Sequence, residues 1–201
     1  MRPGIAVVLP SREGPVVMID AGATADARPE PSPQLAAMGR LFSQHVVGVA
    51  HPRVGLLSIG EEAERGSEGV IAAHALLRGT PGFVGNVEGR DIPRGTVDVV
   101  VTDGFTGNVA LKLYEASAAF LMAEIRDAVT STVRGRIGGL LVRPALRRMR
   151  ERLDPDTYGG AHLLGVQGMS VIGHGSSGPT AVANAIRAAA RAMDALGTGA
   201  V

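Results

Sequence analysis

The strongest constraint on the fold of this chain is a set of short apolar runs, each bounded by Gly, Pro or Asp. The runs are mostly continuous rather than alternating, which indicates strands that are buried on both faces. Such strands are typical of a mainly parallel sheet that is covered by helices. We expect strands at Ile5–Leu9, Val16–Ile19, Val54–Ile59, Phe83–Val84, Val97–Val101 and Met169–Ile172.

Helical patterns alternate with these strands. The first pattern has Ser32 in the N-cap position and Pro33 at the first helical position, which favours a helix start. The alternation predicts a doubly wound α/β domain, in which loops at the carboxyl ends of the strands form the ligand site. We expect helices at Pro33–His45, Ser67–Leu77, about Gly107–Val129 and Pro179–Leu196.

The length of the chain favours a single domain. Its 201 residues, of which 45% are hydrophobic and 19% charged, are enough for one large core. We therefore expect residues 1–201 to form one α/β domain. A doubly wound sheet usually has more strands than the sequence offers, and the first strand begins soon after Met1. We therefore expect the domain to be truncated at its N-terminus.

Composition excludes several classes of function. The chain has no Cys, which excludes a disulfide scaffold, a thiolate zinc site, an iron–sulfur cluster and a Cys nucleophile. Its five histidines show no metal-ligand spacing, so we expect no metal. Aromatic residues are only 3% of the chain, which argues against base stacking on single-stranded nucleic acid. The apolar runs are far shorter than the ~20 residues that span a bilayer.

Four polar, glycine-rich loops each follow a predicted strand, at residues 59–66, 85–91, 102–108 and 173–178. In a parallel sheet these loops would face one crevice. Glycines there let backbone N–H groups approach an anion, and a helix start adds partial positive charge. Ordinary turn chemistry is the alternative for any single loop, because turns favour Gly, Asn, Asp and Ser. The recurrence of the pattern favours an anion site.

The last of these loops contains the spacing G-x-G-x-x-G, at Gly173, Gly175 and Gly178. A dinucleotide site also needs a second parallel strand with an acidic residue at its tip, and the sequence offers neither. We therefore favour a phosphate or carboxylate ligand at this loop. His174 is a candidate acid, base or hydrogen-bond donor. The neighbouring serines lack the flanking glycines of a hydrolase nucleophile elbow.

Lys112 is the only lysine among 20 basic residues. A compact ammonium suits a point contact to phosphate better than a planar guanidinium does. The alternative is an ordinary exposed residue on a helix.

Residues 131–153 form a basic segment, with seven arginines between Arg134 and Arg152 and the single acid Glu151. We expect a helical hairpin of two short helices that meet near Gly138–Leu141, with Pro144 starting the second. Three explanations stand: a solvated excursion that packs in a dimer, an interfacial hairpin on anionic lipid, or docking of an acidic protein or nucleic acid.

Several blocks of sequence, taken together and in order, resemble one known family. They are Gly85–Asp91, Asp98–Val109 with Lys112, Tyr158–Ala161 with Leu163–Val166, and Gly173–Ser177, and Val54–Glu62 is similar too. In these blocks the chain resembles the phosphate acyltransferases of bacterial phospholipid synthesis, the PlsX family. The likeness extends over essentially the whole chain, and several long blocks are more specific than one short motif.

The resemblance implies a fold similar to isocitrate and isopropylmalate dehydrogenases. It also implies transfer of a fatty acyl group from acyl carrier protein to inorganic phosphate, giving acyl phosphate without a cofactor. A homodimer in the cytoplasm, attached peripherally to the inner face of the membrane, is implied as well. Members of the family begin with a further block that contains an Asp-Ala-Met-Gly-Gly-Asp-like motif. No such motif occurs here, so we expect the chain to correspond to the C-terminal part of the enzyme.

Two alternatives to acyl transfer stay open. One is an NAD(P)-dependent dehydrogenase of the isopropylmalate dehydrogenase-like fold. The other is an inactive, basic module that binds membranes.

A mechanism by direct transfer fits the composition, because without a Cys or a serine elbow phosphate itself must attack the thioester. The candidate catalytic residues are Asn86, Lys112 and His174, with His174 as proton donor or oxyanion partner. We expect Glu88, Asp91 and Asp103 to orient ligands or cap helices rather than to act as nucleophiles.

The remaining candidates fall into two sets. Residues expected to bind phosphate or substrate are Gly85, Arg90, Asp103, Gly104, Thr106, Gly107, Asn108, Gly175, Ser176 and Ser177. Residues expected to contact the membrane are Ile137, Leu140, Leu141, Arg143, Arg147 and Arg148. The expected partners are thus acyl carrier protein, inorganic phosphate, an anionic membrane surface and a second copy of the chain, with no nucleic acid.

Overall fold

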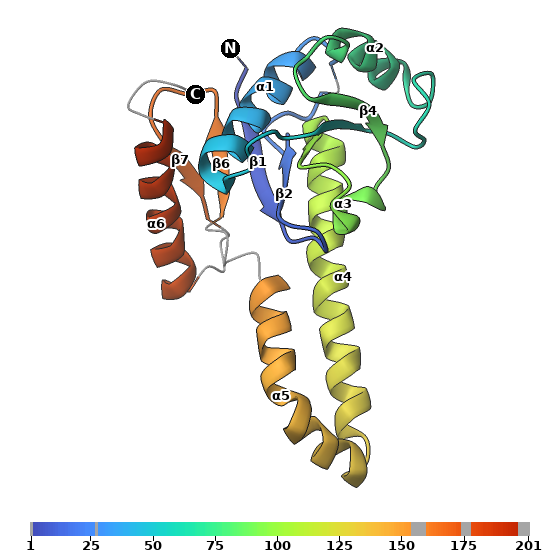
Figure 1. The fold of residues 1–201 in the computed structure, drawn as a ribbon, viewed down its shortest axis with the longest axis vertical. Coiled ribbons are helices and arrows are strands. Elements are labelled where there is room, and N and C mark those ends of the chain that lie inside the picture. Colours follow the sequence, from blue (N-terminus) through green and yellow to red (C-terminus); the bar gives the residue numbers. More distant parts are fainter. Residues whose placement is uncertain (1, 27, 154–159, 174–177, 197–201) are drawn as a thin grey trace.

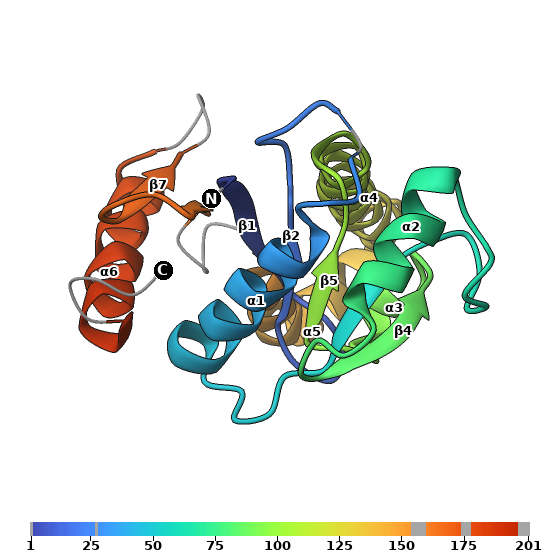
Figure 2. The same cartoon turned by 90° about the horizontal axis from the view of Figure 1, so that it is seen from above.

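The computed structural model describes residues 2–26, 28–153, 160–173 and 178–196. In these residues it shows a seven-stranded sheet with helices on both faces (Figures 1 and 2). The strands are β1 (Gly4–Leu9), β2 (Val16–Ile19), β3 (Val54–Leu57), β4 (Phe83–Val87), β5 (Val99–Val101), β6 (Ala161–Leu164) and β7 (Ser170–Ile172). The helices are α1 (Ser32–Phe42), the π-helical turn η1 (Ser43–Val47), α2 (Glu68–Leu77), α3 (Asp91–Arg94), α4 (Gly104–Thr130), α5 (Val133–Leu153) and α6 (Pro179–Leu196).

The order of the strands across the sheet is β4-β3-β5-β2-β1-β6-β7. Pairing is parallel from β4 through β3 and β5 to β2, and antiparallel between β2 and β1, β1 and β6, and β6 and β7. Five of these strands therefore run in one direction, and β1 and β7 run in the other. The predicted α/β class with a mostly parallel sheet is confirmed.

The two reversed strands have a simple cause. Only residues 10–15 join β1 to β2, and only residues 165–169 join β6 to β7. Parallel neighbours need a crossover connection of about a dozen residues or more. Connections this short allow only hairpins, so β1 and β7 run against their neighbours.

Several predicted boundaries are wrong. Ser32 is the first residue of α1 rather than its N-cap, which is Pro31 and makes no side-chain cap hydrogen bond. β3 ends at Leu57, and Ile59 is exposed in the following loop. β4 continues to Val87, α4 begins at Gly104, and β6 was not predicted.

The core has two layers, one on each face of the sheet, and β5 lies between them. All three residues of β5 are fully buried. Val99 and Val101 belong to the cluster that contains Leu35 of α1 and Leu77 of α2, while Val100 belongs to the cluster bordered by α4. A strand this short is stabilised by burial on both faces, as its continuous apolar run predicted.

An ion pair joins the amino ends of β3 and β5. Nε of Arg53 lies 3.0 Å from Oδ2 of Asp98, which also accepts a hydrogen bond from the Arg53 backbone N–H at 2.8 Å. The hydrogen bond to Asp98 raises the pKa of Arg53, against the opposing effect of partial burial. The two strands pair in parallel from these ends, so their carboxyl ends also lie together.

Helices α4 and α5 lie side by side and extend away from the sheet (Figure 1). Helix α5 is a single helix with Pro144 inside it, so the predicted pair of short helices within 131–153 is wrong. The turn lies at Ser131–Thr132, because α4 continues to Thr130 and Thr132 Oγ1 accepts a hydrogen bond from the N–H of Gly135 at 3.0 Å. No helix in the described part of the chain has the length and apolar character to cross a membrane.

Candidate functional site

The carboxyl end of β2 leads into a tight loop built around Asp20. The side chain of Asp20 is fully buried. Its Oδ1 accepts hydrogen bonds from the backbone N–H groups of Ile5, Gly22 and Ala23 at 3.0, 3.0 and 2.7 Å. Its Oδ2 accepts from the N–H and Oγ1 of Thr24 at 3.0 and 2.9 Å. These donors replace water around the carboxylate and hold the loop in one shape.

Asp20 was not among the residues predicted from the sequence. The signal was present, because a lone Asp follows a buried apolar strand and precedes a small-residue stretch that offers backbone N–H groups.

Two glycines at the start of α4 pack directly on this loop. A Cβ at Gly107 would lie 1.9 Å from the carbonyl oxygen of Asp20, and one at Gly104 would lie 2.1 Å from the carbonyl oxygen of Thr24. Only glycine permits backbones to approach this closely. The two glycines were predicted to bind phosphate, and in this structure they allow close contact between two protein segments.

Asp103 is the N-cap of α4. Its Oδ1 accepts a hydrogen bond from the backbone N–H of Thr106 at 2.9 Å, and the side chain of Thr106 is exposed. A cap of this kind satisfies one of the free N–H groups of the first turn. The cap role expected for Asp103 is confirmed, and its carboxylate is directed to its own helix.

Asn108 and Lys112 lie one turn apart on the same face of α4, and both line a cavity of about 490 Å³. Nζ of Lys112 lies 3.1 Å from Oε2 of Glu115, and the Lys112 side chain is about half exposed. An ion pair this exposed contributes little stability, so the ammonium can exchange its partner for a ligand at low cost. Gly173, at the end of β7, lines the same cavity. Two predicted side chains thus lie beside the start of the fourth loop.

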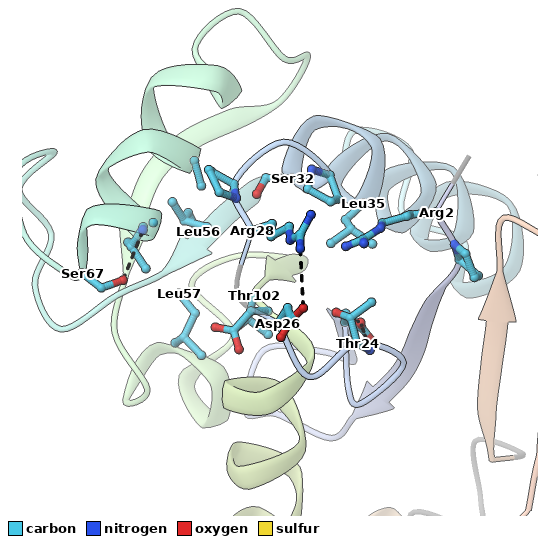
Figure 3. Close-up of a pocket in the computed structure, with 18 residues that line it drawn as sticks. Arg2, Thr24, Asp26, Arg28, Ser32, Leu35, Leu56, Leu57, Ser67 and Thr102 are labelled. Carbon is cyan, nitrogen blue, oxygen red and sulfur yellow. Dashed lines mark hydrogen bonds and ion pairs between the residues drawn. The ribbon is translucent and has the colours of Figure 1, made fainter.

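A second, smaller pocket of about 50 Å³ lies at the carboxyl ends of β2, β3 and β5 (Figure 3). Arg2 and Arg28 line it from one side and Ser67, the N-cap of α2, from another. Arg28 lies 3.8 Å from Asp26, with both side chains exposed. This is the edge at which α/β sheets bind ligands. Arg2, Arg28 and Ser67 were not predicted, because no motif or fixed spacing in the sequence distinguishes them.

Asn86 occupies a different place from the one predicted. It is buried in β4, where its Nδ2 donates to the carbonyl oxygen of Glu62 at 2.7 Å and its Oδ1 lies 2.8 Å from Nδ1 of His74. An amide oxygen can only accept, so His74 carries its proton on Nδ1. Both polar atoms of Asn86 are engaged by protein partners. His74 is itself buried.

The loop after β4 holds Arg90 in two ion pairs. The guanidinium of Arg90 lies 3.2 Å from Glu88 and 3.5 Å from Glu61, all three side chains being partly or largely exposed. Oδ2 of Asp91 accepts a hydrogen bond from the N–H of Glu88 at 2.8 Å, so this carboxylate bonds a backbone group of its own loop. Gly85 has a φ of +111°, which disfavours other residues there.

The fourth loop lies mostly outside the described residues. His174, Gly175, Ser176 and Ser177 are not described, so their roles stay predictions. The expectation that all four loops follow strands of one direction is wrong. β7 runs opposite to β3, β4 and β5, so its carboxyl end lies at the other edge of the sheet. A dinucleotide site is also disfavoured, since β7 pairs antiparallel with β6 rather than starting a parallel unit.

The residues predicted to contact a membrane all lie on α5 and are exposed. The apolar ones are Ile137, Leu140 and Leu141, and the basic ones are Arg143, Arg147 and Arg148. Leu141 has 80% of its surface exposed. Among the described residues, no cluster of His, Asp and Glu could hold a metal ion.

Comparison with known proteins gives a consistent result. A family model described as fatty acid synthesis protein matches residues 1–196. The phosphate acyltransferase of Halothermothrix orenii is 49% identical over 191 residues, covering 94% of this chain and 57% of that protein. The phosphate acyltransferase of Thermus thermophilus is 52% identical over 196 residues, covering 96% of this chain and 60% of that protein.

Among solved structures, the EutD phosphotransacetylase from Staphylococcus aureus matches with a TM-score of 0.48 and 14% identity, over 59% of this chain and 43% of that one. A likeness this weak supports no conclusion about the site.

The chain spans 57 to 60% of the length of the two curated relatives. The resemblance to the phosphate acyltransferases is confirmed, and these matches give no support to the dehydrogenase alternative. Because the family match extends over nearly the whole sequence, the chain belongs to the fatty acid synthesis protein family, in which its relatives from Halothermothrix orenii and Thermus thermophilus are named phosphate acyltransferases.

Proposed function

We propose that this chain carries an acyl-transfer site, at which a fatty acyl group passes from acyl carrier protein to inorganic phosphate to give acyl phosphate. The observation that carries the proposal is the family match over residues 1–196, with relatives named phosphate acyltransferase at about half identity. The cavity beside Asn108 and Lys112 supplies a place where a phosphate and an acyl thioester can meet.

The reaction needs no covalent intermediate on the protein. A phosphate oxygen attacks the thioester carbonyl carbon, a C–O bond forms, and the C–S bond then breaks. The carrier leaves as a thiolate, which takes up a proton, and the acyl phosphate remains. The protein contributes by holding an anion close to a carbonyl and by stabilising the negative charge that develops on the carbonyl oxygen.

Lys112 is the side chain best suited to hold the phosphate. Its ammonium is half exposed and its ion pair with Glu115 is open to solvent, so a phosphate can compete for it. Asn108 lies one turn earlier on the same face and can donate its amide N–H groups to a phosphate or to the carbonyl oxygen. Together they can position the nucleophile against the carbonyl.

The other predicted residues have less direct roles. Asn86 is a positioning residue, because its buried amide joins β4 to α2 and to the loop after β3. Arg90 can reach a phosphate only by leaving Glu88 and Glu61. His174 stays our candidate for the proton donor or oxyanion partner, and Gly175, Ser176 and Ser177 stay candidates for backbone and hydroxyl contacts to phosphate.

The expected partners and location belong to the same proposal. We propose a homodimer with the isocitrate dehydrogenase-like fold, in which residues 1–201 form one domain that takes its substrate from acyl carrier protein. The hairpin of α4 and α5 would rest on anionic lipid at the inner face of the membrane. Exposed apolar residues and flanking arginines on α5 support this proposal.

The test is an assay with the purified chain, palmitoyl-acyl carrier protein and inorganic phosphate. Acyl phosphate is trapped with hydroxylamine and measured as the hydroxamate. We expect hydroxamate that requires both the chain and phosphate. The proposal is overturned if the chain yields none while the full-length Thermus thermophilus relative yields it under the same conditions. Titration calorimetry with NAD should give no binding heat, and saturable NAD binding would favour a dehydrogenase.

A further inference from the structure

The cavity beside Lys112 has far more apolar surface than a phosphate needs. We propose that it binds the hydrocarbon chain of the fatty acyl group, with the thioester end beside Asn108 and Lys112. This inference rests on the proposed function, and it adds a binding site for a long apolar chain.

The cavity is bounded by elements that are distant in the sequence. Residues of β1, including Ile5, Val7 and Leu9, line one side, and Val171 and Ile172 of β7 line another. Figure 1 shows β1, β6 and β7 between α4 and α6, and both helices contribute lining residues. The cavity therefore lies against the part of the sheet formed by β1, β6 and β7, between α4 and α6.

Helix α6 has one broad apolar face, and only part of it is buried. Ala188 and Ala192 are buried, and the helix contacts η1. Val182 and Ile186, one turn apart, line the cavity and are 50% and 66% exposed. A surface helix usually has one apolar face and one polar face. The exposed part of the apolar face of α6, at Val182 and Ile186, is therefore available to an apolar ligand.

The size of the cavity matches a lipid rather than an anion. Its volume of about 490 Å³ lies within the roughly 300–1,000 Å³ of pockets that bury small organic ligands. The pocket at the carboxyl ends of β2, β3 and β5 has about 50 Å³, space for a few waters. Of these two described pockets, only the larger can hold a long chain.

Among the described residues, polar side chains lie on only one wall of the cavity. They are Asn108, Lys112 and Glu115, all on α4, and the remaining lining residues are apolar or glycine. A ligand that matches this pattern has a long hydrocarbon tail and one polar end. A fatty acyl thioester has that form, and its carbonyl would then lie within reach of the cation that we assign to phosphate.

The test measures binding without any chemical reaction. The probe is cis-parinaric acid, a fluorescent fatty acid with a long hydrocarbon chain, added to the whole chain without phosphate or carrier protein. We expect saturable fluorescence that palmitate displaces. Ile186→Asp should weaken binding by about tenfold or more, equivalent to about 1.4 kcal/mol, because a carboxylate in the cavity must lose water when the tail enters.

The matched control is Met193→Asp, also on α6. Met193 is half exposed but does not line the cavity, so the probe affinity should stay within about twofold. A second pair tests the shape of the cavity. Ala189→Phe, which fills part of it, should weaken palmitate more than decanoate, whereas Ala190→Phe, at an exposed position outside it, should not.

The outcomes separate this inference from the proposed function. If the probe binds and only Ile186→Asp weakens it, the site stands even when the chain makes no acyl phosphate. If the chain makes acyl phosphate but Ile186→Asp changes neither probe affinity nor transfer, the site is wrong. Equal loss in both Asp variants, or no saturable binding, also overturns it. The inference is also overturned if Ile186→Asp converts a dimer to a monomer and leaves the probe affinity unchanged. That result would show that the cavity is an interface between two copies of the chain.

Discussion

Oδ1 of Asn86 lies 2.8 Å from Nδ1 of His74, so a hydrogen bond between two buried side chains connects β4 to α2. The same amide donates to the carbonyl oxygen of Glu62 at 2.7 Å. We expect Asn86→Ala to lower the free energy of unfolding by about 1–3 kcal/mol, because it leaves a buried imidazole N–H and a carbonyl without partners. Urea unfolding measures this change.

The control for this prediction is Asn108→Ala, which removes an exposed amide and should leave unfolding within about 0.5 kcal/mol of the parent chain. Unchanged stability of Asn86→Ala would show that Asn86 does not hold these elements together. That result would favour the catalytic role predicted for Asn86.

Glycine substitutions should have opposite effects at two helical positions. Gly107→Ala places a Cβ 1.9 Å from the Asp20 carbonyl oxygen, so we expect a loss of about 2 kcal/mol or more as the backbones separate. Gly138→Ala in α5 meets nothing within 4 Å and should gain about 0.5–1 kcal/mol from the higher helix propensity of alanine. Thermal unfolding followed by circular dichroism distinguishes them, and a stable Gly107→Ala variant would contradict the close approach.

Lys112→Ala should reduce acyl transfer by at least about tenfold, or 1.4 kcal/mol of barrier, because it removes the cation to which we assign the phosphate. The loss should appear mainly as weaker saturation by phosphate. Lys112→Arg should retain part of the rate, since it keeps the charge but not the compact ammonium. Arg126→Ala, an exposed position on the same helix, controls for loss of one positive charge. Transfer by Lys112→Ala at the parent rate would refute the assignment.

Replacement of both Leu140 and Leu141 by Asp should abolish flotation with vesicles that contain anionic lipid. The two side chains are among the most exposed apolar residues on α5, and their burial in lipid should provide much of the binding. Flotation of the parent chain should weaken with added salt, because each arginine near the surface contributes about 1 kcal/mol.

The control for the hairpin is Leu113→Asp, a similarly exposed position on α4 but closer to the sheet. It should float like the parent chain. Equal binding of the parent to neutral vesicles, or binding to neither kind, would argue against an anionic-lipid surface.

The sequence predicted those features that depend on local patterns. Continuous apolar runs located β2 and β5, and the alternation of strands and helices indicated the α/β class. The direction of β1 was also within reach, because its short connection to β2 allows only a hairpin. The alternating pattern of Ala161–Leu164, half of it buried, is weak over four residues, so β6 was missed.

The site was harder to predict, because its geometry depends on contacts between distant segments. Asn86 looked like a ligand-binding residue because it lies in a polar loop block, but its position on β4 directs its amide to His74. Gly104 and Gly107 looked like a phosphate cradle, yet they meet the backbone of the Asp20 loop. No local pattern indicates which backbone a glycine will approach.

The most direct test of attack by phosphate is to measure, by rapid quench, the release of thiol from palmitoyl-acyl carrier protein. The measurement is made in the presence and in the absence of inorganic phosphate. Our account predicts that thiol appears only with phosphate, one acyl phosphate per thiol, and that the mass of the protein stays unchanged throughout. A burst of thiol without phosphate together with a protein heavier by one acyl group, or no phosphate-dependent release at all, would contradict it.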